Sequence, residues 1–134
     1  MTCYIDTSAI YAVLDRDDAH HPRAKDTWTD LLRRKTPLVT SNYVLVETTA
    51  LVQSRLGMAA VRTFQEAMCP VFGVHWTDEA LHKKGMSGVL SANRRELSLV
   101  DCVSFALMHE LGIRDVFAFD PHFSEQGFQC QPGS

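Results

Sequence analysis

The chain has 134 residues, of which 46% are hydrophobic and 22% charged, with a formal net charge of -3 at pH 7. This composition predicts a single globular domain over residues 1–134, and no apolar run is long enough to span a membrane. The first residues contain no basic signal region and the four cysteines form no CxxC pair, so we expect a reduced, cytoplasmic protein. The net negative charge does not indicate nucleic-acid binding.

Strand and helix patterns alternate over the first forty residues. A β-rich run ends at Asp6 and is followed at once by a helical pattern, which is typical of a central parallel strand. The elements predicted here are a strand over 2–5, a helix over 7–14, a helix over 22–34 and a strand over 38–40. The polar stretch between 15 and 22 predicts a solvated loop, in which His20 and His21 have no ligand partner at metal spacing.

The middle of the chain repeats this alternation. Ser41 or Asn42 is expected to cap a helix that runs to Leu56, stops at Gly57 and carries Glu47 near its start. The elements that follow are a helix over 58–68, a strand over 71–76, and a helix capped by Thr77 or Asp78 that reaches about residue 89. A polar link containing Arg94 and Arg95 leads to the last helix.

The last helix is predicted over 98–110, where Ser98 and Asp101 resemble a helix-start pair and Gly112 is a stop. A strand over 116–119 then ends at Asp120, which precedes Pro121. An edge segment over 128–130 and a loose tail over 131–134 complete the chain. The order of elements predicts an α/β fold with a largely parallel sheet and helices on both faces.

Four acidic residues follow predicted strands or begin predicted helices: Asp6, Glu47, Asp101 and Asp120. Because the carboxyl ends of parallel strands meet at one edge, these acids can converge there. A bare cluster of like charges repels itself, and oxygen ligands select Mg²⁺ or Mn²⁺, which activate water and stabilise phosphoryl charge. Taken singly, Asp6 and Asp101 also fit plain helix caps, and Asp120 fits a turn former.

Four short motifs resemble the PIN-domain ribonucleases, and more closely the VapC-type toxins of toxin–antitoxin pairs. They are Asp6-Thr7-Ser8, Thr40-Ser41-Asn42 followed by Glu47-Thr48, Ser98-Leu99-Val100-Asp101, and Phe119-Asp120-Pro121-His122-Phe123. The resemblance covers almost the whole chain. It implies a three-layer α/β/α sandwich, Mg²⁺- or Mn²⁺-dependent cleavage of single-stranded RNA regions, an antitoxin that occludes the site, and often a homodimer.

The resemblance also implies roles for particular residues. Its four acids correspond to Asp6, Glu47, Asp101 and Asp120, which would be both catalytic and metal-binding. Thr7, Ser8 and Ser98 are candidate supporting residues. The predicted function is hydrolysis of RNA phosphodiester bonds, and the alternative is a PIN-fold module that binds RNA or protein without useful turnover. Activity with Mg²⁺ on unstructured RNA separates the two.

A ribonuclease must bind a polyanion, so the net negative charge of this chain departs from what the resemblance implies. Arg94 and Arg95, just before the Asp101 helix, are the preferred RNA contacts. Arg33-Arg34-Lys35 is a second candidate, and Lys83-Lys84 is interpreted as a solvated helix end. His122 is interpreted as a turn residue. Trp28 and Trp76 lie at core spacing, which argues against a base-stacking role.

Overall fold

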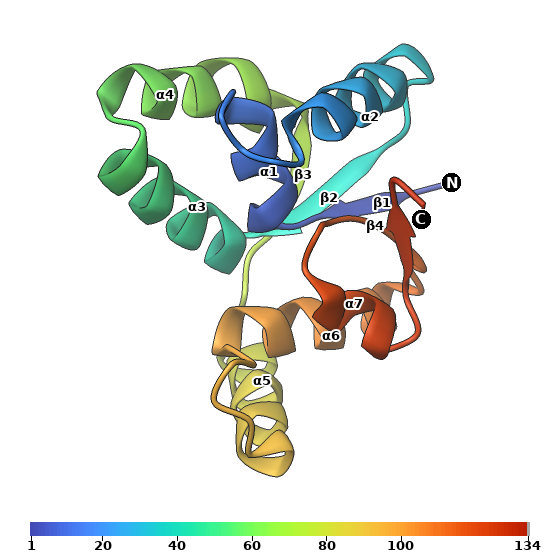
Figure 1. The fold of residues 1–134 in the computed structure, drawn as a ribbon. Helices are drawn as coiled ribbons and strands as arrows, with labels where there is room; N and C mark the ends of the chain where they lie inside the picture. Colours follow the sequence, from blue (N-terminus) through green and yellow to red (C-terminus); the bar gives the residue numbers. More distant parts are fainter. Residues whose placement is uncertain (134) are drawn as a thin grey trace.

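The computed structural model describes residues 1–133, which form a parallel sheet with helices on both faces (Figure 1). The strand order is β3-β2-β1-β4-β5, and every adjacent pair in it is parallel. The strands are β1 (Cys3–Ile5), β2 (Leu38–Ser41), β3 (Phe72–His75), β4 (Asp115–Phe117) and β5 (Gln129–Gln131). The predicted α/β/α fold is therefore confirmed.

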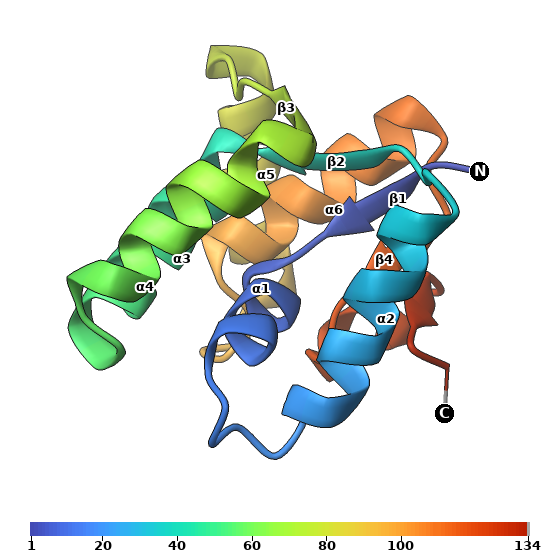
Figure 2. The ribbon, with the colours of Figure 1, turned by 90° about the horizontal axis from the view of Figure 1, so that it is seen from above.

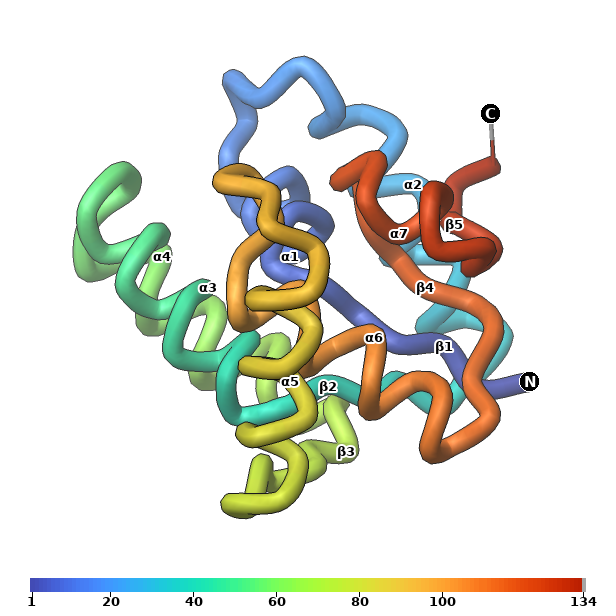
Figure 3. The backbone as a smooth tube through the Cα atoms, turned by 90° about the horizontal axis from the view of Figure 1, so that it is seen from below, coloured from blue at the N-terminus to red at the C-terminus, as the bar shows by residue number. Residues whose placement is uncertain are grey.

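The helices divide between the two faces of the sheet. They are α1 (Thr7–Leu14), α2 (His21–Arg33), α3 (Asn42–Arg55), α4 (Met58–Thr63), α5 (Glu79–Ala92), α6 (Leu99–Leu111) and α7 (Pro121–Glu125). Figure 2 looks onto the face with α1, α2 and α4, and Figure 3 onto the face with α5, α6 and α7. α3 leaves the sheet between these layers and contacts both α1 and α6. Within residues 1–133, no helix has the length and apolar character needed to cross a membrane.

β1 is the central strand of the sheet and is buried on both faces. Cys3, Tyr4 and Ile5 are all fully buried, because helices cover β1 on both faces. The Tyr4 hydroxyl is satisfied by the hydroxyl of Ser104 on α6 at 2.8 Å, so this buried polar group keeps a hydrogen bond. A fully buried central strand is what a parallel sheet covered on both faces requires.

Side-chain caps fix where helices begin after strands. The Ser41 Oγ accepts from the Val44 N–H at 3.3 Å and the Asp78 Oδ1 accepts from the Leu81 N–H at 2.8 Å, which decides between the two predicted caps in each case. Asn42 instead accepts from the Thr77 N–H through its Oδ1 at 2.6 Å. That bond ties the start of α3 to the segment after β3.

Three boundaries differ from the sequence prediction. The predicted helix over 58–68 is α4 followed by a π-helical turn (Phe64–Met68), and a 3₁₀ turn (Cys69–Val71) containing Pro70 delays β3 to Phe72. The predicted core position of Trp76 is wrong, since its side chain is 71% exposed. The apolar alternation extends to Trp76, but the edge strand β3 ends at His75 and the chain turns away from the core.

The C-terminal part of the chain differs more strongly from the sequence prediction. β4 ends at Phe117, two residues before the predicted end, and the helix α7 was not predicted. Asp120 caps α7 and Pro121 is its first residue, an arrangement that favours helix initiation as well as a turn. The predicted tail is wrong for Gln131, which pairs with Phe117 in the sheet, while Ser134 lies outside the described residues. His21, predicted in a loop, begins α2.

The contact between α5 and α6 depends on Gly85. A Cβ at this residue would lie 2.5 Å from Val103 Cγ2 and 3.1 Å from Leu99 Cδ1. Alanine would gain about 1 kcal/mol of helix propensity, but overpacking of this kind costs about 1–3 kcal/mol. We therefore expect Gly85→Ala to lower the free energy of unfolding by about 1 kcal/mol in chemical denaturation.

Gly88 provides the matched control on the same helix. A Cβ there would approach Cys102 no closer than 3.3 Å, so Gly88→Ala should change stability little. Equal stabilisation by both substitutions would show that α5 and α6 have room to separate at Gly85.

Candidate active site

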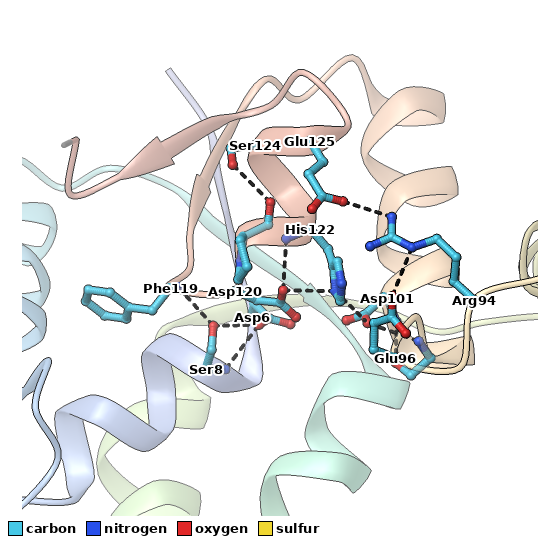
Figure 4. A network of polar contacts seen from close by, with 12 residues as sticks. Asp6, Ser8, Arg94, Glu96, Asp101, Phe119, Asp120, His122, Ser124 and Glu125 are labelled. Atoms are coloured by element: carbon cyan, nitrogen blue, oxygen red, sulfur yellow. Dashed lines mark hydrogen bonds and ion pairs between the residues drawn. The ribbon is translucent and has the colours of Figure 1, made fainter. Parts of the chain in front are cut away.

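The four predicted acids lie at the edge of the sheet where the strands end. Asp6 follows β1 and caps α1, and Asp120 comes after β4 and caps α7. Asp101 is the third residue of α6, and Glu47 lies in the second turn of α3. Figure 4 shows Asp6, Asp101 and Asp120 pointing into one space from three different elements.

Asp6 is held by the start of its own helix while keeping one oxygen free of hydrogen bonds. Its Oδ2 accepts from the Ser8 N–H at 3.1 Å and from the Ser8 hydroxyl at 2.7 Å. Its Oδ1 is buried and has no hydrogen-bond partner among the described residues. Asp6 is thus a helix cap that also presents a buried oxygen without a hydrogen-bond partner among the described residues. Such atoms are rare in folded proteins, and a bound ion or a catalytic role is a common reason for them.

Asp101 and Asp120 are also anchored through helix starts. Asp101 forms a capping box with Ser98: its Oδ2 accepts from the Ser98 N–H, and the Ser98 Oγ accepts from the Asp101 N–H, both at 3.1 Å. Asp120 Oδ1 accepts from the His122 N–H at 2.9 Å. Capping and a further role are therefore compatible, because each cap leaves an oxygen for other partners.

The supporting residues join the elements that carry the acids. The Ser8 hydroxyl, besides bonding Asp6, accepts from the Phe119 N–H at 3.0 Å and so links α1 to the end of β4. Thr7 and Thr48 share a hydrogen bond of 2.9 Å between their hydroxyls, next to Glu47 in sequence. Ser8 and Ser98 thus hold the carboxylates of Asp6 and Asp101, whereas Thr7 makes its hydrogen bonds to α3.

Burial and mutual repulsion raise the pKa values of the acids. Burial raises the pKa of Asp6 to about 7, against the opposing effect of its Ser8 hydrogen bonds, and the charges of Asp101 and Glu47 add to the rise. Burial is also the largest cause of the raised pKa of Glu47 and of Asp101, and Asp120 raises both further. A cluster with these properties is stabilised by a positive charge.

His122 belongs to this cluster, which the sequence prediction of a turn residue missed. Its side chain on α7 is only 12% exposed, and its Nδ1 lies 3.0 Å from Asp120 Oδ1 and 3.8 Å from Asp101 Oδ2 (Figure 4). Ligand atoms of Asp101, Asp120 and His122 all lie within 4.8 Å of one another. The sequence contains one signal for this position, since His122 lies two residues after Asp120. That spacing places the His122 ring beside Asp120 only because Pro121 begins a helix.

The residues present fit a divalent cation. Three ligand atoms lie close enough to share one ion, and the bare Oδ1 of Asp6 faces the same charged region. Carboxylate oxygens are ligands for hard divalent cations. Asp6 and Glu47 lie outside the 4.8 Å set, but the charges of Asp101 and Glu47 both raise the pKa of Asp6, so these acids lie near one another.

The predicted RNA-contact arginines lie on the link before α6. Arg94 already has two acidic partners: its Nε lies 3.1 Å from Glu96 and its Nη1 lies 3.0 Å from Glu125. Arg95 is exposed. Other basic candidates also have acidic partners, in the pairs Arg34–Asp30, Lys83–Glu79 and Lys84–Glu110. An RNA role for Arg94 and Arg95 remains a prediction.

The fold and the site together define a class of protein. Its members are α/β/α domains with a parallel sheet and a group of acids at the carboxyl edge of that sheet. The PIN domain family matches residues 3–129, and the chain belongs to that family. Its catalytic and metal-binding residues remain predictions, as does the extent of the domain over residues 1–134.

Particular relatives narrow the comparison. The chain is 37% identical over 127 residues to the 23S rRNA-specific endonuclease VapC20 of two Mycobacterium tuberculosis strains, covering 93% of this chain and 94% of VapC20. The crystal structure of M. tuberculosis VapC20, described as a sarcin–ricin loop cleaving toxin, matches with a TM-score of 0.84 and 33% identity over 95% of this chain and 96% of that one.

A more distant structure shows the same fold. FitAcB from Neisseria gonorrhoeae matches with a TM-score of 0.69 and 16% identity, covering 96% of each chain. The resemblance to PIN-domain proteins, and to VapC-type toxins among them, is thereby confirmed.

Proposed function

We propose that this chain is a metal-dependent endoribonuclease, acts as the toxin of a toxin–antitoxin pair, and cuts ribosomal RNA. The observation that carries the proposal is the convergence of the acids, with a buried Asp6 oxygen that has no hydrogen-bond partner within residues 1–133. The near full-length similarity to VapC20, an endonuclease specific for 23S rRNA, supports the ribonuclease function and indicates the substrate class.

In this proposal Asp6, Asp101 and Asp120 hold Mg²⁺ or Mn²⁺, and Glu47 completes the cluster. When bound, such an ion activates water and stabilises charge that develops on the phosphoryl oxygens. Ser98 holds Asp101 and Ser8 holds Asp6, so the carboxylates are oriented before RNA arrives. Burial of Asp6 keeps bulk water from its side chain, which strengthens its interaction with a cation.

Cleavage of purified 23S rRNA tests the proposal. The protein is incubated with the RNA in Mg²⁺, in Mn²⁺ or in EDTA, and the ends of the products are mapped by primer extension. We expect cuts at a defined position with either metal and none in EDTA. RNA that is bound but remains intact in both metals would favour the alternative of a binding module without turnover.

The proposed toxin role requires a protein partner. An apolar hollow of about 330 Å³, lined by Tyr43, Val46 and Val100, opens beside Glu47 and is suited to a partner that covers the acids. We expect a small co-transcribed protein to be captured by a pull-down from the native host and to inhibit cleavage. Formation of a homodimer and location in the cytoplasm remain expectations, which light scattering and cell fractionation test.

Arg94 and Arg95 give a separate prediction about RNA binding. If both bind phosphates, replacing both by alanine should weaken binding to different RNA sequences about equally. The salt slope of log K should fall by roughly 0.7 for each single-strand phosphate that the variant no longer neutralises. Affinity is titrated against salt in an Asp101→Asn background, which prevents turnover.

The ion pairs of Arg94 supply the control for this experiment. Replacing Glu125 by glutamine removes one of its acidic partners without removing a cation. Binding should then stay equal or strengthen. An unchanged salt slope in the double arginine variant would assign both residues to the surface and direct attention to residues 33–35.

A further inference from the structure

A cavity of about 660 Å³ opens beside the acid cluster, on the side of α2. Asp120 lines it together with His20, Arg23 and Phe119, and the segment around β5 closes its other side. None of these three neighbours of Asp120 has a role in the proposed cleavage. The cavity thus adjoins the acids through Asp120 and offers a different set of groups.

Two aromatic rings form a stack at this cavity. The imidazole of His20 lies parallel to the Phe119 ring, with 4.4 Å between centroids and 13° between planes. His20 is exposed, whereas Phe119 is partly buried. The stack therefore has a fixed inner ring and an outer ring that solvent reaches, which is the form of a platform for a nucleic-acid base.

Arg23 adds a positive charge to the same cavity. Among the described residues that line it, Arg23 is the only arginine or lysine. Its guanidinium carbon lies 5.9 Å from the centroid of Phe119, and its Nη2 donates to the carbonyl oxygen of Gly133 at 3.1 Å. That partner is uncharged, so the hydrogen bond orients the guanidinium without neutralising it. A phosphate is the anion that an RNA strand would bring there.

The platform is joined to the acids by short hydrogen bonds. The Phe119 N–H donates to the Ser8 hydroxyl oxygen, and the Ser8 hydroxyl donates to Asp6 Oδ2. Figure 4 shows this connection, with the Phe119 ring turned away from the carboxylates. Because Phe119 and Asp120 are adjacent in sequence, a nucleotide bound at the stack would lie next to the phosphodiester at the acids.

We propose that this cavity is a nucleotide-binding subsite for the RNA strand. An unpaired base stacks on His20, and a neighbouring phosphate binds Arg23. The inference rests on the proposed ribonuclease function and names how its substrate is held. It also explains how a chain with a net negative charge could bind RNA. One oriented arginine and one stacking surface would hold the strand without a large basic patch.

Binding of a synthetic RNA hairpin that carries the sarcin–ricin loop sequence tests the subsite. Affinity is measured by fluorescence anisotropy in Mg²⁺ with Asp101→Asn as the background. We expect His20→Ala to weaken binding about tenfold with an unchanged salt slope, and His20→Trp to restore it. Arg23→Gln keeps a donor for Gly133 but removes the charge, and should reduce the salt slope by roughly 0.7.

Matched variants control for general surface effects. His75→Ala and Arg62→Ala change exposed residues of the same types on β3 and α4, and should leave affinity unaltered. Melting temperatures of all variants should agree, because His20 and Arg23 are exposed. Weakened binding in His20→Ala that His20→Trp fails to restore would overturn a stacking role.

Cleavage by the unsubstituted protein separates failure of the subsite from failure of the proposed function. If that protein cuts 23S rRNA, and both variants bind the hairpin as tightly as their background, the subsite alone is wrong. If it neither cuts nor binds RNA, both the function and the subsite are wrong. An unchanged salt slope in Arg23→Gln would remove the phosphate contact from the proposal.

Discussion

Replacing Asp101 with asparagine is expected to reduce RNA cleavage by more than about a hundredfold, beyond the loss usual for a residue that only supports a metal ligand. Asparagine has nearly the same shape and can still accept the hydrogen bond that the Ser98 N–H donates to Asp101. It lacks the negative charge that a hard cation requires. The fold should therefore persist while the chemistry is lost. Initial rates on 23S rRNA, with circular dichroism on the same preparation, measure both.

Asp26→Asn is the matched control for this substitution. Asp26 is an exposed acid on α2 outside the cluster, so the same chemical change there should leave the rate unaltered. Asp120→Asn should behave like Asp101→Asn, because Asp120 belongs to the same set of ligand atoms. An Asp101→Asn protein with full turnover would eliminate Asp101 from the catalytic residues.

The placement of the acids could be predicted because it follows from the topology. Asp6 comes after a strand with an apolar pattern, and Asp120 comes shortly after another. Once the sheet is known to be parallel, both must lie at its carboxyl edge. Asp101 could be placed by its spacing from Ser98, since a residue three positions after a cap lies in the first helical turn. The order of strands and helices was therefore enough to predict where these three acids lie, and no tertiary contact had to be known.

The parts that the sequence did not reveal depend on tertiary structure or on very short elements. α7 has only five residues, too few for a hydrophobic period, so His122 was interpreted as part of a turn. Trp76 continues an alternating pattern beyond the end of its strand, and only the path of the chain shows that it is exposed. Glu125 lies 31 residues from Arg94 in sequence, so that ion pair is a property of the fold.

Asp6→Asn should stabilise the metal-free protein at pH 8. Asp6 is 3% exposed, and the pKa of its carboxyl is raised from 3.8 to about 7, mainly by burial. At 1.36 kcal/mol per pKa unit, holding the ionised form in the fold costs on the order of 4 kcal/mol. An amide oxygen can keep the Ser8 hydrogen bond, and an amide nitrogen in place of Oδ1 is attracted by Asp101 and Glu47. We expect a gain of about 2 kcal/mol in the free energy of unfolding.

The gain should depend on pH in a defined direction. Because the folded pKa of Asp6 lies above the unfolded value, the folded state binds more protons between pH 3.8 and about 7. The unsubstituted protein therefore loses stability as pH rises through this window, and Asp6→Asn removes that loss. The difference between the two proteins should be small near pH 4 and largest above pH 7. Chemical denaturation in EDTA at several pH values measures it.

Addition of metal should reverse the order of stability at pH 8. A cation bound only by the folded state stabilises it by RT ln(1 + [L]/Kd), which is about 2.7 kcal/mol at a hundred times Kd. The unsubstituted protein should gain this with Mg²⁺ or Mn²⁺, whereas Asp6→Asn, with one carboxylate fewer, should gain little. If both proteins respond equally to metal while Asp6→Asn is still the more stable in EDTA, Asp6 is a buried helix cap and the ion is held by the other acids.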